Sequence, residues 1–278
     1  MNFRRAVTGG ILWVALVAIS HTVSAQATEN DIKTLILPGE VFRIESRPAF
    51  ILWPAPELRK SPQPWVMYGP TLPGYPDEHE KWMHEQFLAA GVAVAGIDVD
   101  EAYGSPRSQQ LFTALYNDLT QQRGFSSKPC LLGRSRGGLW VTSWAAGNPD
   151  KVAGIAGIYP VFDFRTYPGL EQAAPAYGLT PAELQSRLVE FNPIERIAGL
   201  VKARVSVCII HGDEDTVVPL KENSAELQQR YTAGGAGAAV QLIIVKGQGH
   251  NFWEGFFRCP ELVEFVIKQA QAGASEMK

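Results

Sequence analysis

The sequence has no excess of basic charge and no uninterrupted apolar run long enough to span a membrane. Its 278 residues contain 25 Lys and Arg against 28 Asp and Glu, a formal net charge of −3. Proteins that bind nucleic acid usually carry a basic face, so this balance argues against a nucleic-acid partner. The apolar segment at residues 6–20 includes two glycines. It is also shorter than the roughly 20 residues of a spanning helix, so we expect no stable membrane insertion.

The same N-terminal segment has the features of a signal peptide. Arg4 and Arg5 precede the apolar stretch, and residues 23–25, Val-Ser-Ala, form a small-residue cleavage site. We therefore expect residues 1–25 to be removed and residues 26–278 to fold as one domain. A chain of this kind is expected to be secreted or periplasmic.

Cysteine is scarce, with only Cys130, Cys208 and Cys259 in the chain. Cys130 and Cys208 fall in two predicted strands that have a third strand between them, which separates them by roughly 9–10 Å. A disulfide needs Cα atoms within about 7 Å, so we expect three free, mostly buried thiols. None of them lies at a strand-to-helix turn, which argues against a cysteine nucleophile.

Metal-binding motifs are also missing. His79 and His84 lie on one predicted helix, but they are five positions apart and do not match the His-Glu-x-x-His spacing of a zinc site. No motif implies a metal ion or an organic cofactor.

Apolar strand-like runs alternate with amphipathic helices, a pattern typical of a mostly parallel sheet covered on both faces. The sequence therefore predicts an α/β fold of about eight strands. The strands are expected at residues 41–45, 50–53, 65–68, 92–98, 130–133, 152–159, 205–211 and 240–245. Helices are expected near residues 78–90, 107–122, 136–146, 221–232 and 260–272.

One long excursion, residues 161–203, follows the sixth predicted strand. It is expected to hold a single helix at residues 181–190, because Pro181 after Thr180 is typical of the first helical position after an N-cap. The excursion is small, so we expect it to leave the site beneath it open.

Ser135 lies in the sequence Gly-Arg-Ser-Arg-Gly-Gly, between a predicted strand and a predicted helix. This arrangement is typical of a nucleophile elbow, in which glycines on both sides permit the sharp turn that exposes the serine hydroxyl. The elbow also places the hydroxyl at a helix N-terminus, where negative charge is favoured. Ser135 is therefore the candidate nucleophile.

Two further motifs follow later strands. Residues 207–215 form a buried strand that ends in acidic residues, and either Asp213 or Asp215 can orient a catalytic histidine. Residues 242–250 form a strand followed by a glycine-flanked loop with His250. His211 ends the earlier strand and is expected to support the acid turn. The order Ser, Asp, His, each after a strand, predicts a catalytic triad.

These motifs resemble those of the α/β-hydrolase superfamily, in its prolyl-oligopeptidase-like or dienelactone-hydrolase-like branch. The resemblance rests on Gly-Arg-Ser-Arg-Gly-Gly, His-Gly-Asp-Glu-Asp-Thr-Val-Val-Pro at 211–219 and Gly-Gln-Gly-His at 247–250, and covers about residues 40–272. The family pattern H-G-x-x-D-x-x-V-P implies Asp215 as the acid. The resemblance further implies the α/β-hydrolase fold and a serine hydrolase mechanism with Ser135, Asp215 and His250, but not a substrate.

The sequence departs from the family at the oxyanion hole. Relatives often carry His-Gly after the third strand, whereas residues 68–70 are Tyr-Gly-Pro here, and proline has no N–H to donate. We therefore predict that the backbone N–H of Arg136 and that of Thr71 or Leu72 hold the oxyanion. The Tyr68 hydroxyl is an alternative donor.

Four side chains are candidates for the substrate pocket, namely Tyr68, Tyr103, Arg134 and Trp253. Tyr103 either reaches the rim of the site or packs inward. Arg134 and Arg136, which flank the serine, either bind a substrate carboxylate or support the oxyanion, or else pair with nearby acids such as Asp98, Asp100 or Glu101. A serine followed by arginine also resembles glucuronoyl esterases, which act on uronic-acid esters. Trp253 and its neighbour Phe252 either stack on a sugar, line an acyl pocket or pack in the core.

The leading hypothesis is an exported hydrolase that cleaves carboxylic esters through an acyl-enzyme, with carbohydrate-linked esters among the candidate substrates. The expected partner is a small-molecule or glycan ester, and the sequence does not indicate an oligomeric state. A prolyl-oligopeptidase-type peptidase is the alternative, although such enzymes usually carry a propeller for which the segment before the sheet is too short. A non-catalytic binding protein on the same fold is the third hypothesis, and an intact triad argues against it.

Overall fold

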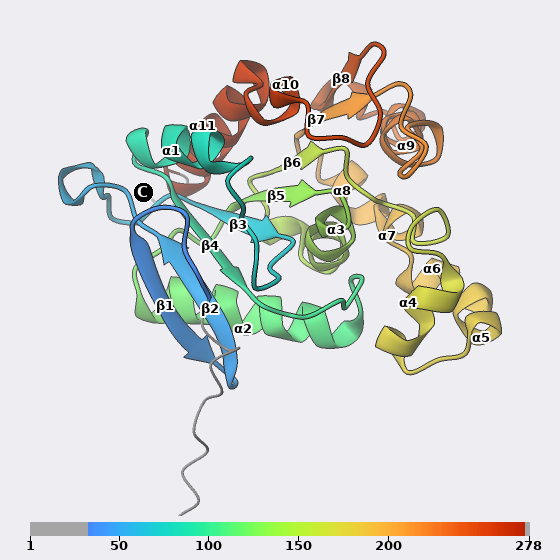
Figure 1. Cartoon of the computed structure of the whole chain (residues 1–278), viewed down its shortest axis with the longest axis horizontal. Coiled ribbons are helices and arrows are strands. Elements are labelled where there is room, and N and C mark those ends of the chain that lie inside the picture. Colours follow the sequence, from blue (N-terminus) through green and yellow to red (C-terminus); the bar gives the residue numbers. More distant parts are fainter. Residues whose placement is uncertain (1–32, 276–278) are drawn as a thin grey trace, which may run out of the picture. The chain divides into compact units, whose positions relative to one another are not determined.

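The computed structural model describes residues 33–275, which are built around one eight-stranded sheet (Figure 1). The strand order is β1-β2-β4-β3-β5-β6-β7-β8. The strands are β1 (Gly39–Ile44), β2 (Arg47–Leu52), β3 (Trp65–Gly69), β4 (Ala93–Ile97), β5 (Cys130–Arg134), β6 (Gly154–Ile158), β7 (Val207–Gly212) and β8 (Val240–Val245). The predicted signal peptide at residues 1–25 and the domain start at residue 26 lie outside the described residues.

The strands from β3 to β8 run parallel, whereas β1 and β2 form an antiparallel hairpin whose second strand pairs with β4. Every residue of β3, β4, β5, β6 and β7 is buried. Strands covered on both faces are mostly apolar or small, which explains their apolar runs in the sequence. Arg134 near the end of β5 and His211 near the end of β7 are buried exceptions. The prediction of a mostly parallel sheet of about eight strands is confirmed.

Helices cover both faces of this sheet. On one face lie α2 (Pro106–Gln122), α3 (Gly137–Gly147) and α9 (Glu226–Ala233), which contribute to one buried apolar cluster. On the other lie α1 (Lys81–Ala89) and α11 (Pro260–Ser275), with Phe87 and Val266 in a second cluster. Figure 1 shows α2 and α3 on the opposite side of the sheet from α1 and α11. Each fully buried side chain of this size contributes about 1.5–3 kcal/mol.

The excursion between β6 and β7 is more helical than the sequence predicted. It contains α4 (Leu170–Tyr177), α5 (Pro181–Ser186), α6 (Leu188–Phe191), α7 (Pro193–Arg196) and α8 (Ala198–Lys202). The single helix expected at residues 181–190 divides into α5 and α6 at Arg187. The predicted start is correct, because Thr180 forms a capping box with Glu183 and Pro181 follows it. Helices this short have too few turns for an apolar period to be recognised in sequence.

Short helical turns complete the connections. They are η2 (Pro56–Leu58), η3 (Pro149–Lys151), η5 (Gly237–Ala239) and α10 (Glu254–Phe257). The helix predicted at residues 221–232 begins as a π-helix, η4 (Lys221–Ala225), before it continues as α9.

The three cysteines are free and buried, as predicted. Burial raises the pKa of Cys208 to about 12 and that of Cys259 to about 11. Thiols that stay protonated in this way are poor nucleophiles, which fits their packing role.

In the described part of the chain, no helix has both the length and the apolar character required to cross a membrane. The parallel strands all end at one edge of the sheet, and the loops that follow β5, β7 and β8 therefore meet there.

Candidate active site

Ser135 occupies a strained turn between β5 and α3. Its φ angle is +50°, in the left-handed region that residues with a side chain rarely adopt. A Cβ atom on Gly137 would lie 2.2 Å from the backbone of Gly69, and one on Gly133 would lie 2.9 Å from the Cα of Gly138. The two glycines of the motif are therefore required by close backbone contacts. The turn is the nucleophile-elbow geometry.

The structure brings Ser135, His250 and Asp215 together from three separate loops. The Oγ atom of Ser135 lies 2.8 Å from Nε2 of His250, and Nδ1 of His250 lies 2.7 Å from Oδ2 of Asp215. Since the carboxylate accepts the Nδ1 proton, Nε2 is free to accept the serine proton. This arrangement can deprotonate the hydroxyl during attack on a carbonyl carbon.

Asp215 is held as a carboxylate by several donors. Its Oδ1 atom accepts hydrogen bonds from the backbone N–H of Val217 at 3.0 Å and of Val218 at 2.8 Å. Burial by itself raises the pKa of Asp215, but hydrogen bonds from His211, His250 and Val218 outweigh it and hold the pKa well below its usual range. Asp215 thus stays ionised.

Asp213, the other candidate acid, lies elsewhere. Its carboxylate accepts hydrogen bonds from Nζ of Lys246 at 3.0 Å and from the backbone N–H of Gly247 at 2.7 Å. It therefore ties the acid loop to the end of β8 and does not contact His250.

A cavity of about 180 Å³ opens beside Ser135 and His250. Apart from these two residues, its walls contain two arginines, several aromatic rings, a proline and an amide. The lining residues are Pro70, Tyr75, Arg134, Arg136, Tyr159, Tyr167, Asn251 and Phe252.

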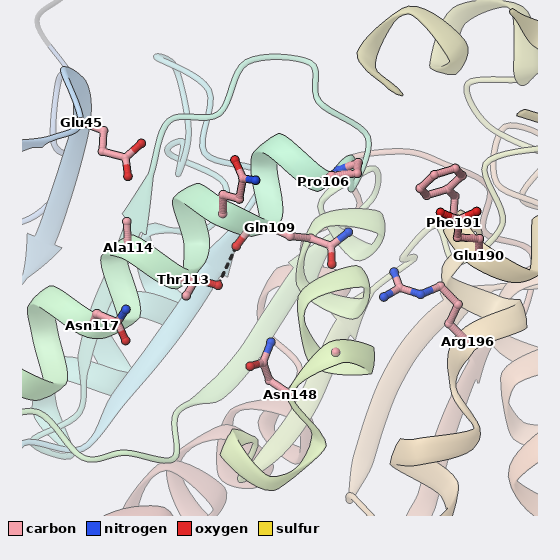
Figure 2. Close-up of a pocket in the computed structure, with 12 residues that line it drawn as sticks. Glu45, Pro106, Gln109, Thr113, Ala114, Asn117, Asn148, Glu190, Phe191 and Arg196 are labelled. Carbon is pink, nitrogen blue, oxygen red and sulfur yellow. Dashed lines mark hydrogen bonds between the residues drawn. The ribbon is translucent and has the colours of Figure 1, made fainter. Parts of the chain in front are cut away.

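A larger cavity, of about 650 Å³, lies away from this site (Figure 2). Figure 2 shows Gln109, Thr113 and Asn117 on one helix, facing Phe191 and Arg196 from the excursion. None of the three proposed catalytic residues lines it. Size alone therefore does not mark the reactive site.

Arg134 is the centre of a buried ionic network under the cavity. Its Nη1 atom lies 2.9 Å from Oδ2 of Asp77 and 2.8 Å from Oε2 of Glu80. Burial alone lowers the pKa of Arg134, but Glu80 and the other nearby acids outweigh it, so the guanidinium stays charged. Arg134 therefore lines the cavity, as predicted, but its partners are acids that the sequence analysis did not single out.

The prediction that Tyr68 lines the pocket is wrong. Tyr68 is fully buried, and its hydroxyl donates to the Glu80 carboxylate at 2.7 Å. Because β3 is buried on both faces, the Tyr68 side chain points toward α1 and not into the cavity. Tyr68 is therefore part of the network that holds Arg134. The hydroxyl is not available as an oxyanion donor.

The other predicted oxyanion residues lie around the elbow. The backbone N–H of Arg136 has no acceptor among the described residues, and the side chain of Arg136 pairs with Glu101 at 2.6 Å. Thr71 is buried and its hydroxyl bonds to Ile97, while the Leu72 carbonyl accepts from Nζ of Lys33 at 2.8 Å. Neither Thr71 nor Leu72 lines the cavity. A donor from this segment stays a prediction.

Tyr103 and Trp253 do not line the cavity, contrary to prediction. Tyr103 is buried, and its hydroxyl accepts a hydrogen bond from Gln172 of α4 at 3.0 Å, so it anchors the excursion. Trp253 is 43% exposed and packs edge-on against Phe256. On the loop after His250, the aromatic side chain that lines the cavity is that of Phe252, one residue before the predicted Trp253.

Sequence reasoning missed Tyr75 and Tyr159. The Tyr159 ring lies 4.3 Å from the His250 ring, and Tyr159 has a φ angle of +35°. Its position directly after β6, at the carboxyl edge of the sheet, was a usable signal. Tyr75 lies in a proline-rich loop with no such pattern.

No cluster of His, Cys, Asp and Glu suited to a metal ion occurs among residues 33–275. Acyl transfer by a Ser-His-Asp array uses these side chains together with oxyanion donors and water.

Comparison with known proteins identifies the family of the chain. A model of the prolyl oligopeptidase family, Peptidase_S9, matches residues 98–268, which is more than half of the chain. No curated protein matches the chain.

Solved structures with the same fold differ greatly in length. A puromycin hydrolase S511A mutant complexed with PGG is 17% identical with a TM-score of 0.61, over 86% of this chain and 39% of that one. Est1E from Butyrivibrio proteoclasticus is 19% identical with a TM-score of 0.61, over 84% of this chain and 99% of that one. MPT51 (FbpC1) of Mycobacterium tuberculosis is 14% identical with a TM-score of 0.64, over 84% and 99%. The chain thus spans about two fifths of the puromycin hydrolase, and these likenesses concern the fold alone.

Proposed function

Because this chain belongs to the prolyl oligopeptidase family of serine hydrolases, we propose that it hydrolyses carboxylic esters through an acyl-enzyme on Ser135. The observation that carries the proposal is the continuous hydrogen-bonded array from Ser135 Oγ through His250 to Asp215, with distances of 2.8 and 2.7 Å. An intact array of this kind also argues against a purely binding role.

In the proposed reaction, Nε2 of His250 takes the hydroxyl proton as Ser135 Oγ attacks the ester carbonyl carbon. Asp215 stabilises the resulting imidazolium, and the backbone N–H of Arg136 donates to the oxyanion. The imidazolium then gives its proton to the leaving alcohol as the C–O bond breaks. Water repeats the attack with His250 as base, which releases the acid and restores the serine.

The charge of the cavity favours esters over peptides with a free amino terminus. Its lining has two arginines and no carboxylate among the described residues. A site that holds an ammonium group needs an acidic partner, because a charge removed from water must be paired. The acids that pair with the two arginines, Asp77 and Glu80 with Arg134 and Glu101 with Arg136, are already engaged.

The size of the cavity favours a short acyl group. About 180 Å³ is below the roughly 300–1,000 Å³ of pockets that enclose drug-sized ligands. We therefore expect acetyl to butyryl groups to fit and long acyl chains to be excluded.

The test is hydrolysis of p-nitrophenyl acetate, butyrate and palmitate by the purified protein, beside the Ser135→Ala variant. The expected result is turnover of the short esters that Ser135→Ala lacks. Aminoacyl p-nitroanilides, assayed in parallel, measure the peptidase alternative. Turnover of the anilides with no hydrolysis of the esters would assign the chain to the peptidases.

We further propose that the protein is secreted or periplasmic and that residues 1–25 are removed on export. The proposal rests on the basic, apolar and small-residue segments of the N-terminus. N-terminal sequencing of the protein purified from culture fluid or periplasm is expected to begin at Gln26. Recovery only from the cytoplasm with an intact N-terminus would overturn it.

A further inference from the structure

A second hollow, of about 440 Å³, adjoins the catalytic cavity, and Phe252 lines both. It lies between the start of α1 and the segment that follows His250. His79, Trp82 and Glu85 come from the first side, and Phe252 and Arg258 from the second. We call it the outer groove.

The chemistry of the triad determines which part of a substrate faces the outer groove. In acyl transfer the histidine must reach the oxygen of the leaving group in order to protonate it. The alcohol part of an ester therefore lies over His250. The chain that continues from His250 forms one wall of the groove, so the alcohol part extends toward it.

The walls combine aromatic faces with hydrogen-bonding groups. The rings of His79 and Phe252 stack at 4.3 Å, and Phe252 is 58% exposed. The guanidinium of Arg258 lies 6.0 Å from the Trp82 ring. Aromatic rings beside polar groups suit a ligand that has both apolar C–H faces and hydroxyls.

The charges of the groove are almost balanced. Lys81 pairs with Glu78 at 3.5 Å and Arg258 pairs with Glu254 at 2.8 Å, both across exposed side chains. Glu85 is exposed and forms no ion pair within residues 33–275. A groove with one spare carboxylate can accept hydrogen bonds from hydroxyls but repels an anionic ligand.

We propose that the outer groove binds a neutral carbohydrate, the alcohol part of the ester whose acyl group enters the catalytic cavity. This inference rests on the proposed ester hydrolysis at Ser135. It assigns Trp82 and Glu85 as binding residues for the sugar.

The experiment measures binding separately from catalysis. Calorimetric titration of the Ser135→Ala variant with acetylated xylotetraose and with acetylated methyl xyloside reports affinity without turnover. The tetrasaccharide is expected to bind at least tenfold more tightly than the monosaccharide. Adding Trp82→Ala is expected to remove most of that difference, and adding Glu85→Gln to reduce it severalfold.

Trp253→Ala in the same background is the matched control, because Trp253 is an exposed tryptophan next to Phe252 and lines neither hollow. It is expected to keep the tetrasaccharide preference. Melting curves for each variant show whether the fold is intact, and Glu85→Gln on an exposed side chain carries the test if Trp82→Ala unfolds.

The outcomes separate the two proposals. Equal affinity for both sugars, or a preference unaffected by Trp82→Ala and Glu85→Gln, overturns the groove. Tighter binding of the tetrasaccharide that requires Trp82, in a protein whose native form hydrolyses no ester, supports the groove and contradicts the esterase reaction.

Discussion

The Nε2 atom of His211 lies 3.3 Å from Oδ2 of Asp215, the oxygen that accepts the Nδ1 proton of His250 at 2.7 Å. His211 is fully buried, with Nδ1 2.7 Å from Oγ of Ser224 and Nε2 2.9 Å from the Val218 carbonyl. Nε2 therefore carries the proton and points it at the acid loop. Because η4 supplies Ser224, the π-helix takes part in orienting Asp215.

Replacing His211 should impair catalysis by misplacing Asp215. For His211→Leu we expect kcat/KM to fall about 10- to 100-fold, since small displacements of a catalytic group carry penalties of this order. Loss of the His211 hydrogen bond should also raise the pKa of Asp215. His211→Gln, which keeps an N–H donor, should recover much of the activity. An unchanged kcat/KM for His211→Leu, or no recovery in His211→Gln, each measured on folded protein, would contradict a positioning role.

Asp215 and Asp213 should differ sharply on substitution. We expect Asp215→Asn to lower kcat about 10⁴-fold, because the wrong histidine tautomer is then favoured. Asp213→Asn removes only contacts with Lys246 and Gly247 and should stay within threefold of the native rate. Steady-state kinetics with p-nitrophenyl acetate compares the two, and similar losses would mean that the acid has been misassigned.

Tyr75 is one of three tyrosines on the cavity wall, and its hydroxyl offers a donor in place of the N–H that Pro70 lacks. If its hydroxyl holds the oxyanion together with the Arg136 amide, Tyr75→Phe should lower kcat about 100-fold, or roughly 3 kcal/mol in the barrier. KM should change little. Tyr167→Phe, on the same wall, is the control. A normal kcat for Tyr75→Phe would favour the backbone N–H of Thr71 or Leu72.

The Glu80–Arg134 pair should matter for stability. Burial raises the pKa of Glu80, while the charge of Arg134 lowers it. Burial disfavours the charged form of both groups, and each is stabilised in that form by its partner. Glu80→Leu leaves the guanidinium buried with Asp77 alone, and we expect unfolding free energy to fall by about 3 kcal/mol. The double variant Glu80→Leu, Arg134→Met should recover most of this in urea denaturation. Equal losses in both would show that packing, and not charge, is responsible.

His84 should make stability depend on pH. Its side chain is fully buried, neither ring nitrogen has a hydrogen-bond partner among the described residues, and burial lowers its pKa to about 3. In the unfolded chain His84 takes up a proton near pH 6.5, whereas in the folded chain it stays neutral down to about pH 3. The free energy of unfolding therefore decreases as the pH falls from about 6.5 to 3. At pH 5 the loss is about 2 kcal/mol.

His84→Phe should remove this part of the pH dependence, as measured by denaturation at pH 7 and pH 5. Met83→Leu, at the adjacent buried position of α1, is the control and should keep it. The explanation would be wrong if both variants lost the same free energy between the two pH values.

The order of strands and helices follows from the sequence because each buried strand is a continuous apolar run and each long helix has an apolar face. Ser135 and His250 were recognisable because glycines and a preceding strand impose their turns. Only the family pattern distinguished Asp215 from Asp213 as the acid. The contact between Asp215 and His250 agrees with that choice. Among the five short helices between β6 and β7, only the start of α5 was recognisable, from Thr180 and Pro181.

The walls of the site were decided by tertiary structure. Arg134 and Arg136 flank the serine in sequence, yet their partners Glu80 and Glu101 come from distant loops. Phe252 and Trp253 are neighbours in the chain, yet only Phe252 faces the cavity. Local sequence determines the backbone turn that presents a nucleophile, because that turn depends on a few adjacent residues. Which side chains surround it depends on how loops pack across the sheet edge, and no local pattern encodes those contacts.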